Sequence, residues 1–371
     1  MSAKRRIVHL ISSLESGGCE NMLSRTLPLL NDNEYEQIVI TLFRPGSLAA
    51  QLEKNGVRVV TLHLRRLTDF GGLRRLIVEI AALQPSLVLT YLFHADLIGR
   101  LYVQQRIAAP VVPFLRTTYN FARYWPARLF EWITRGFAHH YLANSQSVKA
   151  HYTRHFGVAD QAVTVIPNGI DVEVFDEAEG AEVVQELALP DNRFVVTCVA
   201  NLAKNKGHRY LLEAFEQVLR AHPNAWLLLV GEGAEERALR SQIEGHAAQR
   251  SIIFLGRRSD VPNILAASDV FVLPTFFEGM SNAVQEAMAA RLSVVTTDIP
   301  ENKVLITHRD TGLLVPTQDT QSLAAALMEL ADDQSLRSRL GSNARQTIEG
   351  RFGMPTVLSL WRNAFDTRSM Q

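Results

Sequence analysis

The feature that most constrains the fold is an alternation of short aliphatic or β-branched runs with longer amphipathic segments, which starts twice within 371 residues. Strand, helix and strand at this spacing predict a parallel sheet with helices on both faces. Because the chain is long for one α/β core, we expect two doubly wound Rossmann-like domains in series. Ligands of open parallel sheets bind at the carboxyl ends of the strands, so two such domains can face one central cleft.

The first domain is expected over residues 1–170. Its strands are predicted at 6–11, 37–42, 57–62, 87–92, 111–115, 141–143 and 163–166. Its helices are predicted at 21–30, 47–55, 73–83, 95–106, 126–137 and 147–156. This alternation has no repeats and no low-complexity tail.

The run Pro167-Asn168-Gly169 interrupts the alternation because these residues favour a turn. The acidic stretch 171–186 is predicted to cross to a second domain over 171–352. Its strands are predicted at 194–199, 226–230, 252–255, 270–273, 293–296 and 313–315, and its helices at 208–221, 234–246, 263–267, 282–290, 322–331 and 334–349. A C-terminal helix within 353–371 is expected to cross back to the first domain.

Composition narrows the class of protein. The most apolar stretch, residues 80–93, is broken by Gln84 and Pro85 and is shorter than the roughly 20 residues of a membrane span. The N-terminus is basic and then apolar over only about five residues, which predicts a first strand and not a signal peptide. Cys19 and Cys198 lie far apart in sequence and suit a reducing compartment. We therefore expect a cytoplasmic protein.

Two glycine-containing loops follow predicted strands. Gly17 and Gly18 precede a predicted helix, where paired glycines allow close backbone approach and the helix offers N–H groups to an anion. A purely structural turn is the alternative. The spacing is not the G-x-G-x-x-G of a dinucleotide-binding fold. Lys204 and Lys206 precede Gly207 at a second helix start, where an ammonium group can meet a diphosphate. The alternative for both lysines is a solvated charge, since this is no Walker A loop.

Two carboxylates flank a third predicted helix start. Glu278 lies in the turn after the strand at 270–273, Ser281 or Asn282 caps the helix, and Glu286 lies about one turn inside it. Carboxylates pair with vicinal hydroxyls, and the helix start favours negative charge. The arrangement suits a molecule with hydroxyls at both ends and phosphates between. For Glu278 alone, a dipole-stabilising acid is the alternative.

Together these motifs resemble glycosyltransferase family 4, also called group 1, over nearly the whole chain. The resemblance is carried, in order and at matching spacing, by Gly17-Gly18 with Glu20, Val165 to Asp171, Lys206-Gly207, Asp269 to Pro274, and Glu278 with Glu286. It implies a GT-B fold and a bacterial polysaccharide- or glycolipid-type sugar transferase. The implied reaction moves a sugar from a nucleotide-sugar to a saccharide or lipid-linked saccharide with retention of anomeric configuration.

The resemblance also implies roles for single residues. Glu286 is expected to hold the ribose, Glu278 the hydroxyls of the donor sugar, and Lys206 the diphosphate. Gly279, Met280, Ser281 and Asn282 supply backbone groups to the sugar and phosphates, and Arg257 lies where relatives meet the base. His94 matches a histidine directed at the donor sugar; without the resemblance, a capping or core histidine is equally acceptable. We thus take His94, Lys206 and Glu278 as catalytic candidates.

One position departs from the family pattern, because Asn201 stands where relatives usually carry an arginine that neutralises the diphosphate. Either Lys204 compensates or the diphosphate depends more on helix dipoles. No D-x-D occurs in the chain, so we expect no metal and no other cofactor. UDP is the expected nucleotide and GDP the alternative. A nucleotide-sugar epimerase or phosphorylase on the same scaffold, or a non-catalytic glycan-binding relative, remain rival functions.

Charge suggests a further partner, although the formal net charge is zero. Residues 1–170 hold 19 Lys and Arg against 11 Asp and Glu, which indicates that this half meets an anionic surface. Residues 116–132 interleave arginines with aromatic rings, and Arg65, Arg66, Arg74 and Arg75 form a second basic cluster. We therefore expect a peripheral position at the inner face of the plasma membrane and no nucleic-acid partner. Packing of these rings in the domain core is the alternative.

Overall fold

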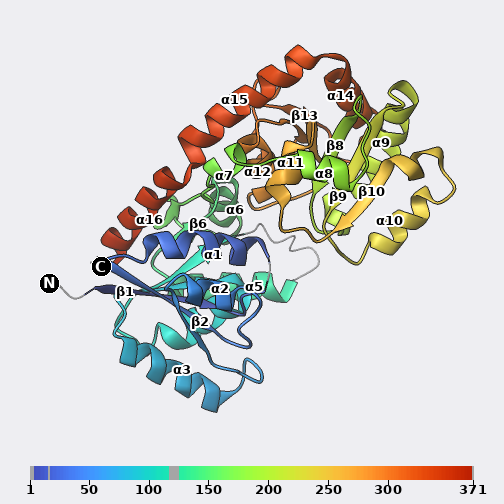
Figure 1. The fold of residues 1–371 in the computed structure, drawn as a ribbon. Coiled ribbons are helices and arrows are strands. Elements are labelled where there is room, and N and C mark those ends of the chain that lie inside the picture. Colours follow the sequence, from blue (N-terminus) through green and yellow to red (C-terminus); the bar gives the residue numbers. More distant parts are fainter. Residues whose placement is uncertain (1–3, 16, 117–124, 370–371) are drawn as a thin grey trace. The chain divides into compact units, whose positions relative to one another are not determined.

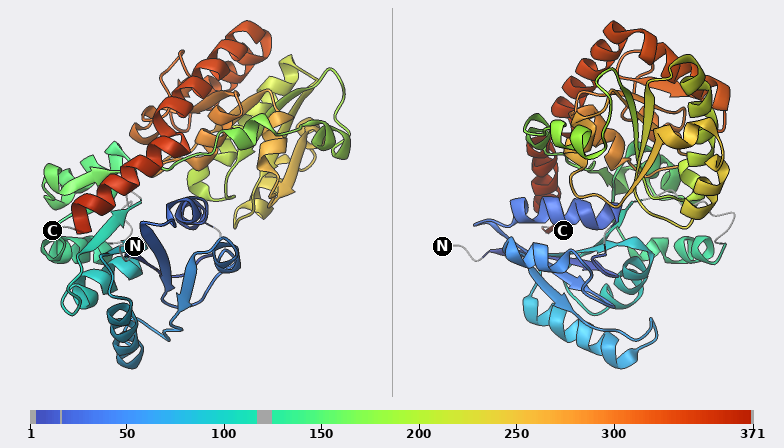
Figure 2. Two further views of the ribbon diagram at one scale, coloured as in Figure 1. Left: turned by 60° about the vertical axis from the view of Figure 1, so that its left-hand side comes forward. Right: turned by 45° about the vertical axis from the view of Figure 1, so that its right-hand side comes forward.

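The structure is a computed structural model that describes residues 4–15, 17–116 and 125–369. The chain divides into two units, one formed by residues 1–169 and 354–371 and the other by residues 170–353. Each unit contains one parallel sheet covered by helices on both faces (Figures 1 and 2). The predicted fold class, α/β with two doubly wound parallel-sheet domains, is therefore confirmed.

The first unit has a seven-stranded sheet in the order β3-β2-β1-β4-β5-β6-β7. The strands are β1 (Arg5–Ile11), β2 (Tyr35–Thr41), β3 (Arg58–Thr61), β4 (Leu87–Tyr91), β5 (Val111–Leu115), β6 (Tyr141–Ala143) and β7 (Val163–Val165). The helices are α1 (Gly18–Leu30), α2 (Ala49–Lys54), α3 (Phe70–Leu83), α4 (Leu92–Ile98), α5 (Trp125–Thr134), α6 (Gln146–Phe156) and α16 (Met354–Ser369), with shorter turns η1 (Gly99–Val103), η2 (Arg135–Phe137) and η3 (Asp160–Ala162). Because β1 and β4 are central neighbours, the loops that follow them leave the same edge of the sheet.

The helix predicted over residues 95–106 differs from the observed structure in its start and in its type. It begins at Leu92 as α4, immediately after β4, and continues from Gly99 as the π-helical turn η1. Leu92 itself has a positive φ of 66°, a conformation that costs a branched residue strain. Such backbone features gather at functional sites, and here they lie beside His94.

The C-terminal helix α16 packs on the first unit, as the sequence predicted. Trp361 and Phe365 are buried with β1 and β2 residues in one apolar cluster. Arg5 pairs with Asp366 at 2.6 Å, and the Tyr35 hydroxyl donates to the same carboxylate at 2.5 Å. Helix α16 is therefore held by the burial of Trp361 and Phe365 and by the polar contacts of Asp366 near its C-terminal end.

The second unit has a six-stranded sheet in the order β10-β9-β8-β11-β12-β13. The strands are β8 (Phe194–Val199), β9 (Ala225–Val230), β10 (Ile252–Gly256), β11 (Val270–Leu273), β12 (Ser293–Thr297) and β13 (Leu313–Val315). The helices are α7 (Glu173–Asp176), α8 (Ala181–Glu186), α9 (His208–Ala221), α10 (Glu236–Ile243), α11 (Val261–Ala266), α12 (Asn282–Ala289), α13 (Pro300–Lys303), α14 (Thr320–Asp332) and α15 (Gln334–Phe352), with short turns η4 (Lys204–Lys206) and η5 (Ala247–Ser251). The central strands β8, β9 and β11 are apolar on both faces, which is typical of a covered parallel sheet.

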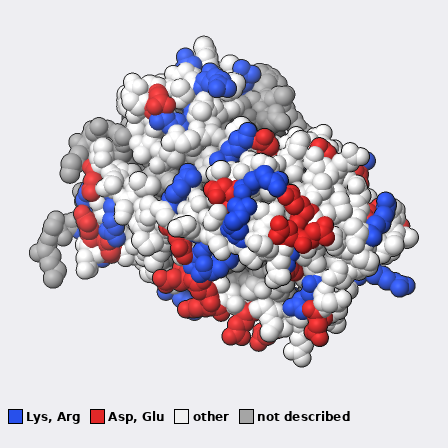
Figure 3. Space-filling model, turned by 90° about the horizontal axis from the view of Figure 1, so that it is seen from above, with Lys and Arg blue, Asp and Glu red and all other residues white. Residues whose placement is uncertain are grey.

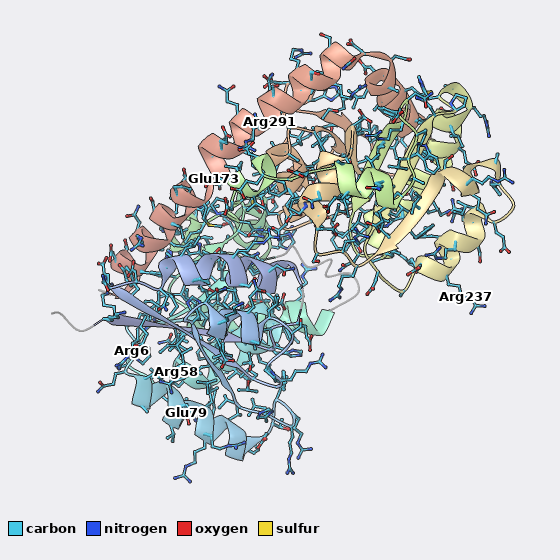
Figure 4. The ribbon with its side chains drawn as sticks, in the orientation of Figure 1. Arg6, Arg58, Glu79, Glu173, Arg237 and Arg291 are labelled. Carbon is cyan, nitrogen blue, oxygen red and sulfur yellow. The ribbon has the colours of Figure 1, made fainter. Side chains whose placement is uncertain are left out.

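The acidic stretch 171–186 does not act as the crossing that the sequence predicted. It folds as α7 and α8 within the second unit, where Val183 of α8 is buried. Asp176 of α7 pairs with Arg291 at 3.2 Å and with Arg345 at 2.5 Å. Figure 4 labels Arg291 and Glu173 on the same side of this unit. The stretch therefore belongs to the second unit, and the chain passes between the units at Gly169–Ile170.

Within the part of the chain that the structure describes, no helix has the length and apolarity needed to span a bilayer. Charge on the surface is mixed in sign over the face drawn in Figure 3, where acidic and basic side chains alternate.

Candidate active site

The loop after β8 carries Lys206 and approaches the end of β11 closely. Gly207 has a φ of 72°, and a Cβ there would lie 2.0 Å from the carbonyl oxygen of Pro274. Glycine is therefore required where the two loops meet. Two hydrogen bonds to the Asn205 carbonyl oxygen hold the contact, one from the Phe276 N–H at 2.8 Å and one from the Thr275 hydroxyl at 3.0 Å.

This contact brings two predicted site residues together. Lys206 Nζ lies 2.5 Å from Glu278 Oε1, although the residues are 72 positions apart in sequence. Their side chains are only 20% and 11% exposed, so water screens the pair incompletely. The resemblance assigned these groups to adjoining parts of one ligand, the diphosphate and the sugar.

The start of α12 lies directly after this pair. The Ser281 hydroxyl accepts a hydrogen bond from the Val284 N–H at 3.3 Å and caps the helix, while Met280 and Ser281 are nearly buried. Gly279 and Asn282 flank the cap. Glu286 is the fifth residue of α12 and is 9% exposed. The helix start thus offers amide groups and positive dipole potential close to the Lys206–Glu278 pair.

Three other predicted donor-binding residues are exposed. Asn201 and Lys204 extend from the loop after β8, and the Lys204 ammonium makes no ion pair among residues 4–15, 17–116 and 125–369. Arg257 follows β10, with its Nε 3.8 Å from Glu232 Oε2. Its neighbour Arg258 is bound by Glu186 and Asp260, so Arg257 is the more adaptable of the two.

The first unit positions the remaining predicted residues. Gly17 is the N-cap of α1, and a Cβ there would lie 2.5 Å from Glu20 Oε2, so a larger residue would displace that carboxylate. Gly18 is exposed at the first helical position. His94 is exposed on α4, and its ring lies 5.8 Å from Phe43 in an edge-on arrangement. Because β1 and β4 are neighbours, the Gly17–Gly18 loop and His94 share one sheet edge.

Comparison with known proteins identifies the family. The sequence model of glycosyltransferase family 4 matches residues 16–174, and that of glycosyl transferases group 1 matches residues 181–347. Together the two matches span both units. The chain is a group 1 glycosyltransferase.

Relatives of this glycosyltransferase include a galactosyltransferase and an enzyme of capsular polysaccharide biosynthesis. The chain is 34% identical over 197 residues to UDP-Gal:alpha-D-GlcNAc-diphosphoundecaprenol alpha-1,3-galactosyltransferase of Escherichia coli, a match that covers 52% of this chain and 51% of that one. The chain thus spans about half the length of that relative. It is 26% identical over 309 residues to the capsular polysaccharide biosynthesis glycosyltransferase CapM of Staphylococcus aureus, covering 81% of each chain.

A solved structure confirms the predicted GT-B fold. Anabaena Alr3699/HepE, crystallised in complex with UDP, superimposes with a TM-score of 0.87 over 98% of this chain and 100% of that one. The two sequences are 22% identical, so the likeness concerns the fold.

Sequence reasoning missed the polar network that supports the site of this glycosyltransferase. Thr297 donates a hydrogen bond to the Thr275 carbonyl oxygen at 2.5 Å, and Asn302 donates to the Thr296 hydroxyl at 2.8 Å. These groups are buried, and their hydrogen bonds hold the segment after β11 against β12 and α13. The signal in the sequence is the pair Thr296-Thr297 at a strand end followed by Asn302. The contact of Arg257 with Glu232 was also missed, and no sequence motif indicates it.

Proposed function

We propose that this group 1 glycosyltransferase transfers a hexosyl group, with retention of configuration, from a UDP-sugar to a lipid-linked saccharide in cell-surface polysaccharide or glycolipid assembly. The observation that carries the proposal is the Lys206–Glu278 pair beside the start of α12, a cation and a hydroxyl acceptor next to amide donors. The E. coli relative takes UDP-Gal and a diphosphoundecaprenol-linked sugar by its name, and HepE binds UDP.

In this proposal the residues act by positioning and charge. Lys206 and the α12 amides stabilise the negative charge that grows on the departing diphosphate. Glu278 holds the hydroxyls of the donor sugar, and Glu286 binds the ribose. His94 supports the sugar near its reacting carbon. The acceptor hydroxyl attacks the same face from which the diphosphate leaves, and the diphosphate takes the proton, so that proximity supplies much of the rate.

We also propose that transfer needs no metal ion or other cofactor, because Lys206 and the helix start can meet the diphosphate directly. The test is transfer activity after extensive dialysis against EDTA, followed by addition of Mg²⁺ or Mn²⁺. Activity that survives chelation supports the proposal, and activity that returns only with a metal contradicts it.

The reaction itself is tested by incubating the enzyme with UDP- and GDP-sugars and an alkyl-diphosphate-linked N-acetylglucosamine acceptor. A disaccharide product with an α-anomeric proton coupling from an α-linked donor supports retaining transfer. Isomerised donor without acceptor consumption would instead identify an epimerase. Sugar 1-phosphate formed from a glycan and phosphate would identify a phosphorylase, and binding without turnover a non-catalytic relative.

Replacing Glu286 by Gln is expected to weaken UDP binding at least about 10-fold. The change keeps the shape of the side chain but removes the charge from hydrogen bonds to the ribose, which are worth roughly 1.5–3 kcal/mol each. Isothermal titration calorimetry measures the effect. Glu244→Gln is a matched control, since Glu244 is exposed at the end of α10. Equal UDP affinity in the Glu286 and Glu244 variants would reject the ribose assignment.

Replacing Lys204 by Ala is expected to weaken UDP binding about 5-fold and to leave uridine binding unchanged. The expectation follows if Lys204 supplies part of the charge that Asn201 cannot, and exposed charge pairs contribute up to about 1 kcal/mol. Both affinities are measurable by calorimetry on the same two proteins. A parallel loss for uridine, or no loss for UDP, shows that Lys204 does not contact the diphosphate.

We place the reaction in the cytoplasm, at the inner face of the plasma membrane. A lipid-linked acceptor keeps its saccharide within reach of a protein that rests on the bilayer surface. The excess of Lys and Arg over residues 1–170 supports an anionic surface as the partner.

A further inference from the structure

Helix α5 buries two polar side chains and leaves three apolar side chains exposed. Glu131 and Thr134 are buried, with exposures of 3% and 0%. Leu129, Trp132 and Ile133 are 48–56% exposed, and Phe137 in the adjoining η2 is 39% exposed. The spacing of Leu129, Trp132 and Ile133 places them on one face of the helix. These four residues are the α5 apolar face; the helix projects from the first unit in the right-hand view of Figure 2.

A buried arginine accounts for this orientation. Arg100 in η1 is 1% exposed and donates to Glu131 through Nη1 at 2.7 Å and through Nη2 at 3.0 Å. Its Nη1 also donates to the Thr134 hydroxyl at 3.0 Å. A buried guanidinium needs a carboxylate partner, so α5 must present Glu131 inward. Surface helices ordinarily bury their apolar stripe, whereas here the pair with Arg100 keeps it exposed.

Two arginines lie beside this face. Glu131 is the one carboxylate between Asp96 and Asp160 in the sequence, and it is paired with Arg100. Arg128 is exposed on α5, and the Arg135 guanidinium lies 5.1 Å from the centre of the Trp132 ring. The α5 apolar face is therefore bordered by positive charge, in contrast to the mixed signs on the face in Figure 3.

We propose that α5 and η2 are the surface by which this glycosyltransferase docks on an anionic lipid bilayer. The α5 apolar face enters the boundary between headgroups and acyl chains, and Arg128 and Arg135 meet the anionic headgroups. Trp favours that boundary layer, and helices with an apolar face and a basic border lie in it. The inference rests on the proposed membrane location and assigns it to named residues. Residues 117–124 of the predicted segment 116–132 lie outside the described residues, so the assignment depends on α5 and η2 alone.

A bilayer fits this surface better than a second copy of the chain. In a symmetric dimer the same patch meets itself, so Arg128 and Arg135 of one copy would approach those of the other. Like charges brought together in this way oppose association. Anionic headgroups present the opposite charge around an apolar interior, which matches both parts of the surface.

The test is co-sedimentation of the purified full-length protein with vesicles of phosphatidylcholine containing 30% phosphatidylglycerol, compared with phosphatidylcholine alone. The protein should bind the anionic vesicles at low salt and be released as NaCl rises, because salt screens the headgroup attraction. The double variant Trp132→Ser/Ile133→Ser should lose at least about 10-fold in partitioning. Leu29→Ser/Val174→Ser is the matched control, since both side chains are exposed and lie on α1 and α7, outside both basic clusters.

Three outcomes would overturn the proposal. The first is a wild-type protein that does not bind anionic vesicles. The second is an α5 variant that binds them as well as the control variant does. The third is a wild-type protein that binds no vesicles but forms a dimer, where the α5 variant is monomeric. Circular dichroism checks that both variants fold. Activity toward a short-chain acceptor in solution reports separately on the proposed transferase function. None of the proposed site residues belongs to α5, so loss of docking should leave this activity intact.

Discussion

Replacing Lys206 by Ala is expected to lower kcat/KM for sugar transfer about 100- to 1,000-fold. Removing one preorganised donor that meets developing negative charge typically costs about 10²–10³ in rate. Lys206 qualifies because the loop after β8 holds its ammonium group 2.5 Å from Glu278, in a place only partly open to water. Initial rates of UDP release, with and without acceptor, measure the effect on the proposed reaction.

Two variants separate this loss from a general loss of charge or of structure. Lys204→Ala removes the same charge two residues earlier, on an exposed side chain, and should change kcat/KM by no more than about 5-fold. Glu278→Gln relieves the unpaired carboxylate that Lys206→Ala leaves behind. If that carboxylate caused the loss, Lys206→Ala in the Glu278→Gln background would be as active as Glu278→Gln alone. A Lys206→Ala enzyme within 3-fold of wild type would remove Lys206 from the proposed mechanism.

The architecture could be predicted from the sequence because it depends on local pattern. Aliphatic runs such as residues 194–199 and 226–230 coincide with β8 and β9 to within a residue, since buried parallel strands require continuous apolar side chains. The glycine at 207 also indicated a special backbone position. Its reason, the 2.0 Å approach of a Cβ to the Pro274 carbonyl, depends on strand order and emerges only in three dimensions.

The candidate site could be predicted only in part. Lys206 and Glu278 were assigned from separate motifs through the family resemblance, and their contact follows from the pairing of β8 with β11. The acidic stretch 171–186 was wrong as a crossing, because it folds as α7 and α8 in the second unit, where Asp176 pairs with Arg291 and Arg345 more than 100 residues away. Sequence proximity carries no information about such partners.

Helix α5 shows the same limit at a single residue. Its sequence alternates apolar residues with charges, which a helical pattern normally assigns to core and solvent respectively. The structure reverses the assignment of Glu131, because Arg100 from another element is buried beside it. The periodicity of one helix contains no information about a buried partner on another element.

Replacing Arg100 by Met is expected to destabilise the first unit by about 3–5 kcal/mol, the usual cost of leaving one member of a buried ion pair without its partner. Burial raises the pKa of the neighbouring Asp96 to about 8, so Asp96 is largely neutral at pH 7 and Glu131 is the charge left unpaired. Urea unfolding monitored by tryptophan fluorescence measures the loss. A Trp226→Phe background restricts the signal to Trp125, Trp132 and Trp361, all in the first unit.

The double variant Arg100→Met/Glu131→Leu identifies the cause. Replacing both members of a buried pair by apolar residues is often neutral, so most of the lost stability should return. If the double variant is no more stable than Arg100→Met, the guanidinium acts through packing and not through its charge.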